Sequence, residues 1–214
     1  MPKMVTELKR NNMRHYFVPS SHSEDEYFTF KAKFDDQEFV FRSCPDIFSK
    51  NELDYGSLVL VNSVLEHKKE FGGKIMDMCC GYGTIAMLLS KFIDAEYYMS
   101  DINTTAVDLA KYNVKSNNCN IEIENITSGN LFEGIKQKFN HIVSNPPIKV
   151  GKKYLLEFVD GSYKHLEDRG TLTLVIKKNL GAGSLKDYLT NLFGNCEVWE
   201  RDKGYYILHS IKTI

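Results

Sequence analysis

The chain has 214 residues, a formal net charge of −1 and 43% hydrophobic residues. This size suffices for one sizeable core, so we expect one main domain with an N-terminal extension. No apolar run approaches the roughly 20 residues that span a bilayer, and charged residues interrupt any signal-peptide pattern, so we expect no membrane association. The five cysteines show no CxxC pair and no metal-ligand spacing. They predict reduced thiols, a cytoplasmic location and no metal site.

The first quarter of the chain predicts an extension built around a β-hairpin. Residues 1–26 are polar and mixed, and we expect a short helix and a linker there. Residues 27–34 and 38–42 alternate apolar and polar side chains on either side of a turn, which predicts two paired strands with one buried face. A helical pattern then covers 57–69. We therefore divide the chain into an N-terminal extension, 1–56, and a main domain, 57–214.

From residue 74 onward, predicted strands and helices alternate. We predict strands at 74–78, 96–100, 120–125, 139–144, 170–177, 197–201 and 205–210. We predict helices at 83–92, 104–116, 152–166 and 183–193. This alternation indicates an α/β fold with a doubly wound, seven-stranded, mostly parallel sheet, and the last two strands form an antiparallel C-terminal hairpin.

A glycine-containing loop follows the first strand of this series. It reads Asp77-Met78-Cys79-Cys80-Gly81-Tyr82-Gly83 and leads into a predicted helix. Glycine lets the backbone turn sharply and lets a ligand approach, while the N–H groups that begin the helix face that ligand. Asp101 ends the next strand, where a carboxylate can accept ribose hydroxyls. The order predicts a nucleoside cofactor. A dinucleotide oxidoreductase is disfavoured because its G-x-G-x-x-G loop needs another glycine.

A second motif, Asn145-Pro146-Pro147, follows the predicted strand 139–144. Neither proline has an N–H, so we expect the Pro146 carbonyl to lack a competing donor beside it. This carbonyl and the Asn145 amide oxygen can accept the two hydrogens of a planar amino group and aim its nitrogen at an electrophilic methyl group. Catalysis would rest on positioning and electrostatics, without a protein nucleophile. The three motif residues are the candidate catalytic residues.

Basic residues next to this motif indicate a nucleic-acid substrate, because lysines can hold phosphates. The candidate substrate-binding residues are Ile148, Lys149, Lys152 and Lys153. A further basic cluster near the N-terminus comprises Lys3, Lys9, Arg10, Arg14 and His15.

The loop resembles the D-x-G-x-G-x-G loop of class I S-adenosylmethionine-dependent methyltransferases, with Cys79 at the first glycine position. The resemblance implies a Rossmann-like fold and S-adenosyl-L-methionine as cofactor. If the first glycine position requires a positive φ, Cys79 is strained. Asn130 stands where the family has an aspartate that contacts the adenine amino group. The implied cofactor-binding residues are Asp77, Cys79, Gly81, Gly83, Asp101, Ile102, Asn103, Asn130, Leu131 and Asn145.

The second motif is similar to the [D/N/S]-P-P-[Y/F/W] motif of amino-methyltransferases, but Ile148 replaces the aromatic residue. A stacked base gains about 1–3 kcal/mol from such a ring. Another ring must supply this stacking, or the base occupies an apolar slot. Tyr55, Tyr82 and Phe48 are the candidate rings.

Residues 47–57 resemble the V-F-S-x-x-x-L-D-x-G-S segment of the ribosomal small-subunit methyltransferase C family, as do 145–153 and 203–207. The resemblance covers about residues 27–214. It implies methylation of guanine N2 in 16S ribosomal RNA, with ribosomal RNA or the small ribosomal subunit as partner. It also implies that Phe48 and the segment 54–57 lie over the cofactor pocket, although Asp54 and Ser57 could instead cap a helix.

Two alternatives stay open at this point. The same amino clamp can serve adenine N6 or a protein glutamine amide. The chain can also be a binding module without turnover, because Cys79, Asn130 and Ile148 depart from the patterns that they resemble. The sequence predicts no oligomeric state.

Overall fold

The computed structural model describes residues 26–45, 47 and 52–213. The helix and linker predicted before the hairpin, the N-terminal basic cluster and Phe48 lie outside the described residues. None of the helices in these ranges is long and apolar enough to cross a bilayer.

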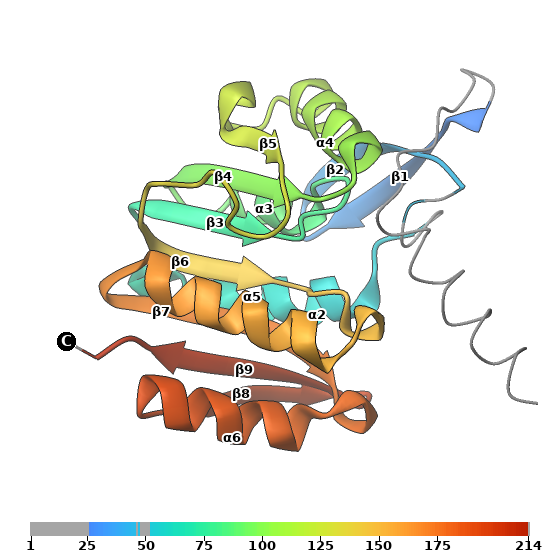
Figure 1. The fold of residues 1–214 in the computed structure, drawn as a ribbon. Helices are drawn as coiled ribbons and strands as arrows, with labels where there is room; N and C mark the ends of the chain where they lie inside the picture. Colours follow the sequence, from blue (N-terminus) through green and yellow to red (C-terminus); the bar gives the residue numbers. More distant parts are fainter. Residues whose placement is uncertain (1–25, 46, 48–51, 214) are drawn as a thin grey trace, which may run out of the picture.

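The centre of the fold is a seven-stranded sheet with the order β5-β4-β3-β6-β7-β9-β8 (Figure 1). Its strands are β3 (Lys74–Met78), β4 (Glu96–Asp101), β5 (Ile126–Ser128), β6 (Phe139–Ser144), β7 (Leu166–Lys177), β8 (Glu197–Asp202) and β9 (Tyr205–Ile211). Strands β3 to β7 are parallel, and β9 is antiparallel to both β7 and β8. The predicted α/β sheet with its antiparallel C-terminal hairpin is therefore confirmed.

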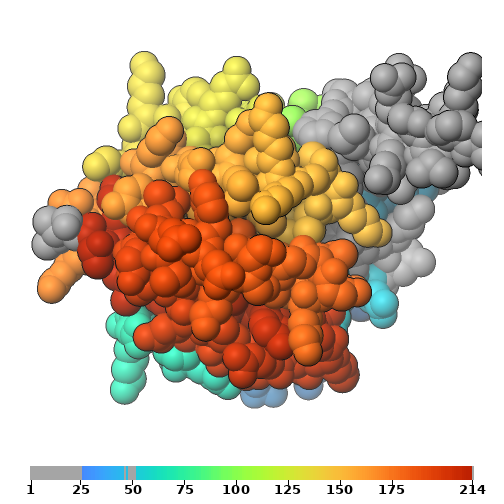
Figure 2. Space-filling view, turned by 60° about the horizontal axis from the view of Figure 1, so that its bottom comes forward, coloured from blue at the N-terminus to red at the C-terminus, as the bar shows by residue number. Residues whose placement is uncertain are grey.

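Helices cover both faces of the sheet. They are α2 (Tyr55–Glu66), α3 (Thr84–Leu89), α4 (Thr104–Ser116), α5 (Lys152–His165) and α6 (Ala182–Phe193). One apolar core joins Leu60 of α2 to Met87 of α3 and to the N-terminal hairpin, while a second core contains Phe158 of α5 and Phe193 of α6. In Figure 1, α5 and α6 lie in front of the sheet and α2 lies behind it. Figure 2 shows the face that α5 and α6 form.

The strand order reverses between β3 and β6. After β3, the chain adds β4 and β5 on one side, and then returns to place β6 on the other side of β3. Met78 and Ser144, the last residues of β3 and β6, are partners in the sheet. Open α/β sheets bind ligands at such a switch point, beyond the carboxyl ends of the strands. Both sequence motifs begin there, as predicted.

The N-terminal hairpin pairs β1 (Phe28–Phe34) with β2 (Gln37–Ser43) and is fastened to α4. The Asn113 Oδ1 atom accepts the Arg42 N–H at 2.7 Å, and its Nδ2 donates to the Arg42 carbonyl at 3.1 Å. Asn117 forms the same pair of bonds with Val40, both at 2.8 Å. The fully buried Asn113 Nδ2 also donates to the Tyr82 carbonyl at 3.0 Å. The hairpin and the loop after β3 therefore share one support.

Several predicted elements differ from the structure. The helix predicted at 83–92 ends at Leu89, and the strand predicted at 170–177 begins at Leu166. The strand predicted at 120–125 is wrong, because Ile123–Asn125 forms a 3₁₀ turn and pairing with β4 begins only at Ile126. The alternating isoleucines there are loop side chains that pack on the core. The helix predicted to reach residue 166 ends at His165, because Leu166 begins β7 and pairs with Phe139 of β6.

Candidate functional site

A cleft opens at the carboxyl ends of β3, β4 and β6. Its lining residues are Asp54, Ser57, Cys79, Cys80, Gly81, Tyr82, Thr84, Ile85, Asp101, Ile102, Asn145, Pro147 and Tyr154. The structure thus brings together the loop after β3, the end of β4 and the proline motif after β6. It adds the start of α2 and the first turn of α5, which sequence patterns alone did not place at the cleft.

The loop after β3 has a left-handed backbone at three positions. The φ angles of Cys79, Gly81 and Gly83 are +63°, +55° and +101°. The first glycine position therefore does require a positive φ, which costs a residue with a Cβ atom about 1 kcal/mol. A Cβ atom at Gly83 would lie 3.0 Å from the Met99 Cε atom and 3.2 Å from the Met87 Sδ atom. Glycine is needed there for close packing as well as for its φ angle.

Asp101 joins this loop to the end of β4. Its Oδ2 atom accepts the Gly81 N–H, and its Oδ1 atom accepts the Asn103 N–H, both at 2.9 Å. Burial raises the pKa of the Asp101 carboxyl above its usual value, and the backbone donors oppose this shift. Each carboxylate oxygen keeps a further lone pair. Asp101 can therefore accept ribose hydroxyls from the cleft while it holds the loop.

Asp77 supports the loop from below and does not line the cleft. It is fully buried, and its Oδ2 atom accepts the Ala86 N–H at 3.0 Å, whereas its Oδ1 atom has no hydrogen-bond partner. Burial, with a smaller contribution from Asp101, raises the pKa of Asp77 to about 8. No cation among the described residues lowers the pKa of either carboxyl. S-adenosyl-L-methionine carries a sulfonium, an ammonium and a carboxylate group, so its net positive charge fits this site.

Besides Asp77 and Gly83, three predicted cofactor residues lie at the same edge of the sheet but outside the cleft lining. The Asn103 Oδ1 atom caps α4 by accepting the N–H groups of Thr105 and Ala106, at 3.0 and 3.4 Å. Asn130 is exposed beyond β5. Leu131 is buried in the core beneath α5, with a φ of +53°. The structure thus brings Asp101 and Ile102 into the cleft, but not these three side chains.

Asn145 is held at the mouth of the cleft by the start of α2. Its Nδ2 atom donates to the Asp54 Oδ2 atom at 2.7 Å and to the Ser57 Oγ atom at 3.0 Å. Asp54 is also the N-cap of α2, because its Oδ2 atom accepts the Ser57 N–H at 2.8 Å. Asp54 therefore both caps the helix and lines the cleft. The two donor contacts leave the amide oxygen as the acceptor that Asn145 offers to a ligand.

The proline motif ends in a tight turn that changes one expectation. The Pro146 carbonyl accepts the Ile148 N–H at 2.9 Å, so the prediction that it lacks a competing donor is wrong. Pro147, with φ −75° and ψ 81°, forms the inverse γ-turn that brings this N–H back. A carbonyl oxygen has two lone pairs, so the Pro146 carbonyl keeps one acceptor position. Pro146 itself is buried and is not among the residues that line the cleft.

The candidate stacking rings differ in their surroundings. Tyr82 lines the cleft but is only 4% exposed, because its ring packs edge-on against Phe30 and Phe41. Tyr55 packs against Tyr205, at a ring-centroid distance of 5.8 Å. Neither ring offers a free face within the cleft.

Sequence reasoning missed Tyr154, an aromatic cleft residue on the first turn of α5. An aromatic residue in the first turn of the helix that follows the motif was the signal that could have found it. The Cys79 thiol lies beside Tyr154, and burial raises the pKa values of Cys79 and Cys80 well above the usual range for a thiol. Both cysteines are therefore neutral thiols and poor nucleophiles.

The predicted substrate-binding residues lie at the start of α5. Lys149, Lys152 and Lys153 are exposed, and Lys153 forms an ion pair with Glu157 at 3.8 Å. Ile148 is half-buried against the core beneath α5 and α6 and is not part of the cleft lining. The described residues contain no group of histidine, cysteine, aspartate or glutamate side chains that could hold a metal ion.

Comparisons with known proteins agree with this geometry. The sequence model of the methyltransferase small-domain family matches residues 38–209. The uncharacterized protein YbxB of Bacillus subtilis is 37% identical over 204 residues, which cover 93% of this chain and 98% of that protein. The ribosomal RNA small subunit methyltransferase C of Psychromonas ingrahamii is 31% identical over 189 residues, which cover 86% of this chain. This chain spans about half of that relative, 51% of its length.

Solved structures share the fold. The Thermus thermophilus 16S rRNA N2 G1207 methyltransferase, in complex with AdoMet and guanosine, superposes with a TM-score of 0.78 at 23% identity. The match covers 91% of this chain and 52% of that chain. A ribosomal protein L11 methylase from Lactobacillus delbrueckii subsp. bulgaricus gives a TM-score of 0.61 at 17% identity, over 75% of this chain and 81% of that chain. The predicted Rossmann-like fold is confirmed.

Proposed function

Because this chain belongs to the methyltransferase small-domain family, we propose that it transfers a methyl group from S-adenosyl-L-methionine to an exocyclic amino nitrogen of RNA. N2 of a guanine in 16S ribosomal RNA is the proposed target, and ribosomal RNA or the small ribosomal subunit is the proposed partner. The orientation of Asn145 carries the proposal. Asp54 and Ser57 take both contacts of its amide nitrogen and leave the oxygen to accept an amino hydrogen.

The cofactor fits the side of the cleft formed by β3 and β4. Asp101 would accept the ribose hydroxyls, Ile102 would lie beside the adenine, and the loop from Cys79 to Gly83 would lie against the rest of the cofactor. The buried carboxyls of Asp77 and Asp101 would balance its positive charges. When bound, S-adenosyl-L-methionine supplies the electrophilic methyl group on its sulfonium sulfur.

The clamp acts on the substrate amino group by positioning it. The Asn145 amide oxygen and the second lone pair of the Pro146 carbonyl accept its two hydrogens, so the nitrogen lone pair can face the methyl group. Positive charge develops on that nitrogen during transfer. The Asp54 carboxylate, 2.7 Å from the Asn145 amide nitrogen, polarises the amide and makes its oxygen a stronger acceptor as this charge grows.

No protein nucleophile is required. The neutral thiols of Cys79 and Cys80 do not compete for the methyl group. The methylated nitrogen is acidic while it carries its extra proton, so this proton passes to solvent water after transfer without a strong protein base.

Two observations support RNA and guanine over the alternatives. Exposed lysines at the start of α5, above all Lys149 and Lys152, can hold phosphates beside the clamp. One relative is named a ribosomal RNA small subunit methyltransferase, and a solved structure with the same fold is described with guanosine bound. Adenine N6 and a protein glutamine amide present the same kind of amino group, and the experiment below separates guanine from adenine.

A strain that lacks the gene, complemented with the wild-type or the Asn145→Ala protein, tests the proposal. Total RNA is digested and modified nucleosides are measured by mass spectrometry. We expect N2-methylguanosine to fall in the deletion strain and to return only with the wild-type protein, while calorimetry shows similar S-adenosyl-L-methionine binding by both proteins. Loss of N6-methyladenosine instead would identify adenine as the target. Absence of cofactor binding by the wild-type protein would indicate a non-catalytic module.

A further inference from the structure

Two tyrosine–lysine pairs lie side by side next to the clamp. The rings of Tyr55 and Tyr205 have centroids 5.8 Å apart and are tilted by 53°. The Lys203 Nζ atom lies 4.5 Å from the Tyr55 ring centroid, and the Lys177 Nζ atom lies 4.8 Å from the Tyr205 ring centroid. We call these four residues the tyrosine–lysine surface.

The fold holds this surface in place from three directions. Lys177 ends β7 and pairs with Tyr205 at the start of β9. The Tyr55 hydroxyl donates to the Asp202 carboxylate on β8. A Cβ atom at Gly56 would lie 2.7 Å from the Tyr205 ring, so only glycine lets α2 begin this close to β9. The two rings are thus fixed by the sheet, and the lysines above them have defined places.

The charge on this surface is exposed and mainly positive. Lys177 and Lys203 are exposed, and so is Lys178, whose N–H donates to the Gly204 carbonyl at 2.8 Å in the same turn region. The neighbouring Asp202 carboxylate already accepts the Tyr55 hydroxyl. A lysine above an aromatic ring at an exposed site gains only about 0.5–1 kcal/mol, so these pairs add little to stability. Their ammonium groups keep donors for a phosphate oxygen.

The start of α2 links this surface to the clamp. Tyr55 directly follows Asp54, which accepts a hydrogen bond from Asn145. The lysines at the start of α5 belong to the helix layer on the other face of the sheet from α2. A nucleic-acid strand whose target base enters the cleft would therefore have cations near the clamp on both sides.

We propose that the tyrosine–lysine surface binds backbone phosphates of an unpaired RNA segment next to the target nucleotide. The inference rests on the proposed function in that it takes RNA as the substrate. Lys177 and Lys203 supply the phosphate contacts, and the rings of Tyr205 and Tyr55 hold the ammonium groups in position. A single strand fits better than a duplex because the target amino group must leave any base pair to reach the clamp.

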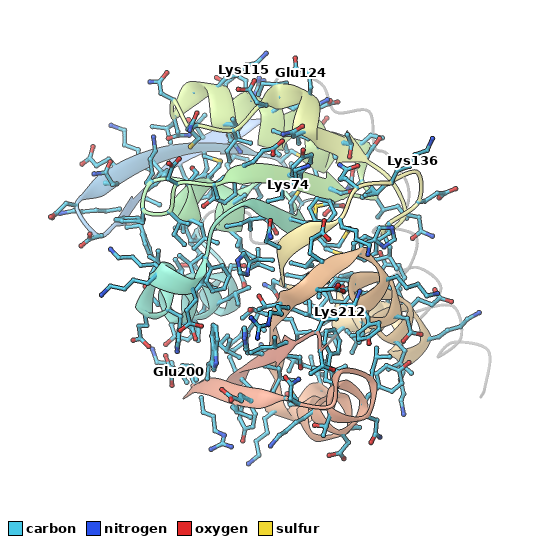
Figure 3. All side chains as sticks on the ribbon, turned by 90° about the vertical axis from the view of Figure 1, so that its left-hand side faces the viewer. Lys74, Lys115, Glu124, Lys136, Glu200 and Lys212 are labelled. Atoms are coloured by element: carbon cyan, nitrogen blue, oxygen red, sulfur yellow. The ribbon has the colours of Figure 1, made fainter. Side chains whose placement is uncertain are left out.

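The test measures binding of a fluorescent, guanine-containing single-stranded RNA at several salt concentrations. We expect the Lys177→Ala/Lys203→Ala protein to bind about 10-fold more weakly at 0.1 M salt. The slope of log K against log salt should become shallower by about 1.4, because each phosphate contact on a single strand contributes about 0.7. The matched control is Lys74→Ala/Lys136→Ala, which removes the same charge from two residues outside the cleft lining (Figure 3). Lys74 begins β3, at the end of the strand that faces away from the cleft. Lys74 also lies over a tyrosine ring, 5.9 Å from the Tyr98 centroid.

Two further variants test the role of the rings. Tyr205→Phe should bind the RNA as the wild-type protein does, whereas Tyr205→Leu should bind about threefold more weakly at unchanged S-adenosyl-L-methionine affinity. An equal loss of RNA affinity in the two double-lysine proteins would overturn the proposal, since the change in net charge would then explain both losses. Competition by polyglutamate as strong as by RNA would also overturn it. A wild-type protein that binds RNA through this surface but methylates none would contradict only the proposed function.

Discussion

The Asn145 amide nitrogen lies 2.7 Å from the Asp54 carboxylate, although 91 positions separate the two residues in the chain. The contact joins the N-cap of α2 to the end of β6. A capping residue therefore also decides which way the Asn145 amide faces.

The Asp54→Asn substitution separates these two roles. Asparagine caps helices about as well as aspartate, so thermal stability should change little. The negative charge behind Asn145 is lost and the amide can turn, so we expect kcat to fall about 100-fold. S-adenosyl-L-methionine affinity, measured by calorimetry, should stay within about twofold of wild type. Ser57→Ala removes the weaker contact and should reduce kcat less than about 10-fold. A normal kcat in Asp54→Asn would show that Asn145 needs no charge behind it.

The strain of the left-handed backbone at Cys79 can be measured by comparing the stabilities of two variants. Cys79→Ala and Cys79→Gly both remove the sulfur, but only glycine adopts a φ of +63° without strain. We expect the glycine protein to be more stable than the alanine protein by about 1 kcal/mol in urea unfolding. Alanine is the more stable of the two at most positions with a negative φ. An alanine protein that is more stable than the glycine protein would show that Cys79 carries no strain.

Cofactor binding should depend on pH through Asp77. The pKa of Asp77 is raised to about 8, so the carboxyl is protonated at neutral pH in the free protein. A cationic cofactor favours the ionised form, so binding releases a proton and S-adenosyl-L-methionine affinity should rise between pH 6 and 8, by up to about tenfold per pH unit. Asp77→Asn should show a flatter curve in calorimetry. The amino group of the cofactor titrates in both experiments, so only the difference between the proteins reports Asp77, and parallel curves would contradict the prediction.

Two buried histidines should make the fold sensitive to acid. His141 bonds to the Thr171 hydroxyl, with 2.8 Å between Nδ1 and Oγ1, and His209 bonds to Thr173 at 2.9 Å and stacks on Trp199. Burial lowers the pKa of His141 to about 4 and that of His209 to about 3, the latter helped by neighbouring histidines. Unfolded histidine takes up a proton near pH 6.5. Below that pH the unfolded chain binds more protons than the folded chain, so acid favours unfolding.

His209→Gln isolates one of these groups. The wild-type advantage in the free energy of unfolding over this variant should shrink by about 2 kcal/mol between pH 7 and pH 5. The comparison must be between the two proteins, because the raised pKa of Asp77 acts with the opposite sign over the same range. Urea unfolding at both pH values provides the measurement. A constant difference would mean that His209 is protonated in the folded state near its usual pKa.

The sequence predicts the strand–helix alternation well because the main-domain strands and helices have clear periodicity. It misplaces β5, whose three residues are too few to show a period, while Ile121 and Ile123 before it alternate for reasons of loop packing. The positions of Asp101 and Asn145 at the cleft follow from their places at strand ends. The exposed position of Asn130 and the burial of Asp77 do not, because they depend on how the loops pack.

The partner of Asn145 could not be predicted, since contacts between residues far apart in the chain leave no local pattern. The resemblance placed Asp54 over the pocket, and helix-start chemistry made it a cap. Only the folded chain shows that Asp54 has both roles. Its Oδ2 atom accepts the Ser57 N–H of the helix cap and also the Asn145 amide N–H.

Asn113 sets a limit on how far this chain can be shortened. A polypeptide that began at residue 57 would retain α4 but would lose Arg42, the partner of both the oxygen and the nitrogen of this fully buried amide. Only the bond to the Tyr82 carbonyl would be left. Anyone who trims the protein for crystallisation or screening should therefore keep the hairpin, because its removal would loosen the backbone on which the cofactor is expected to rest.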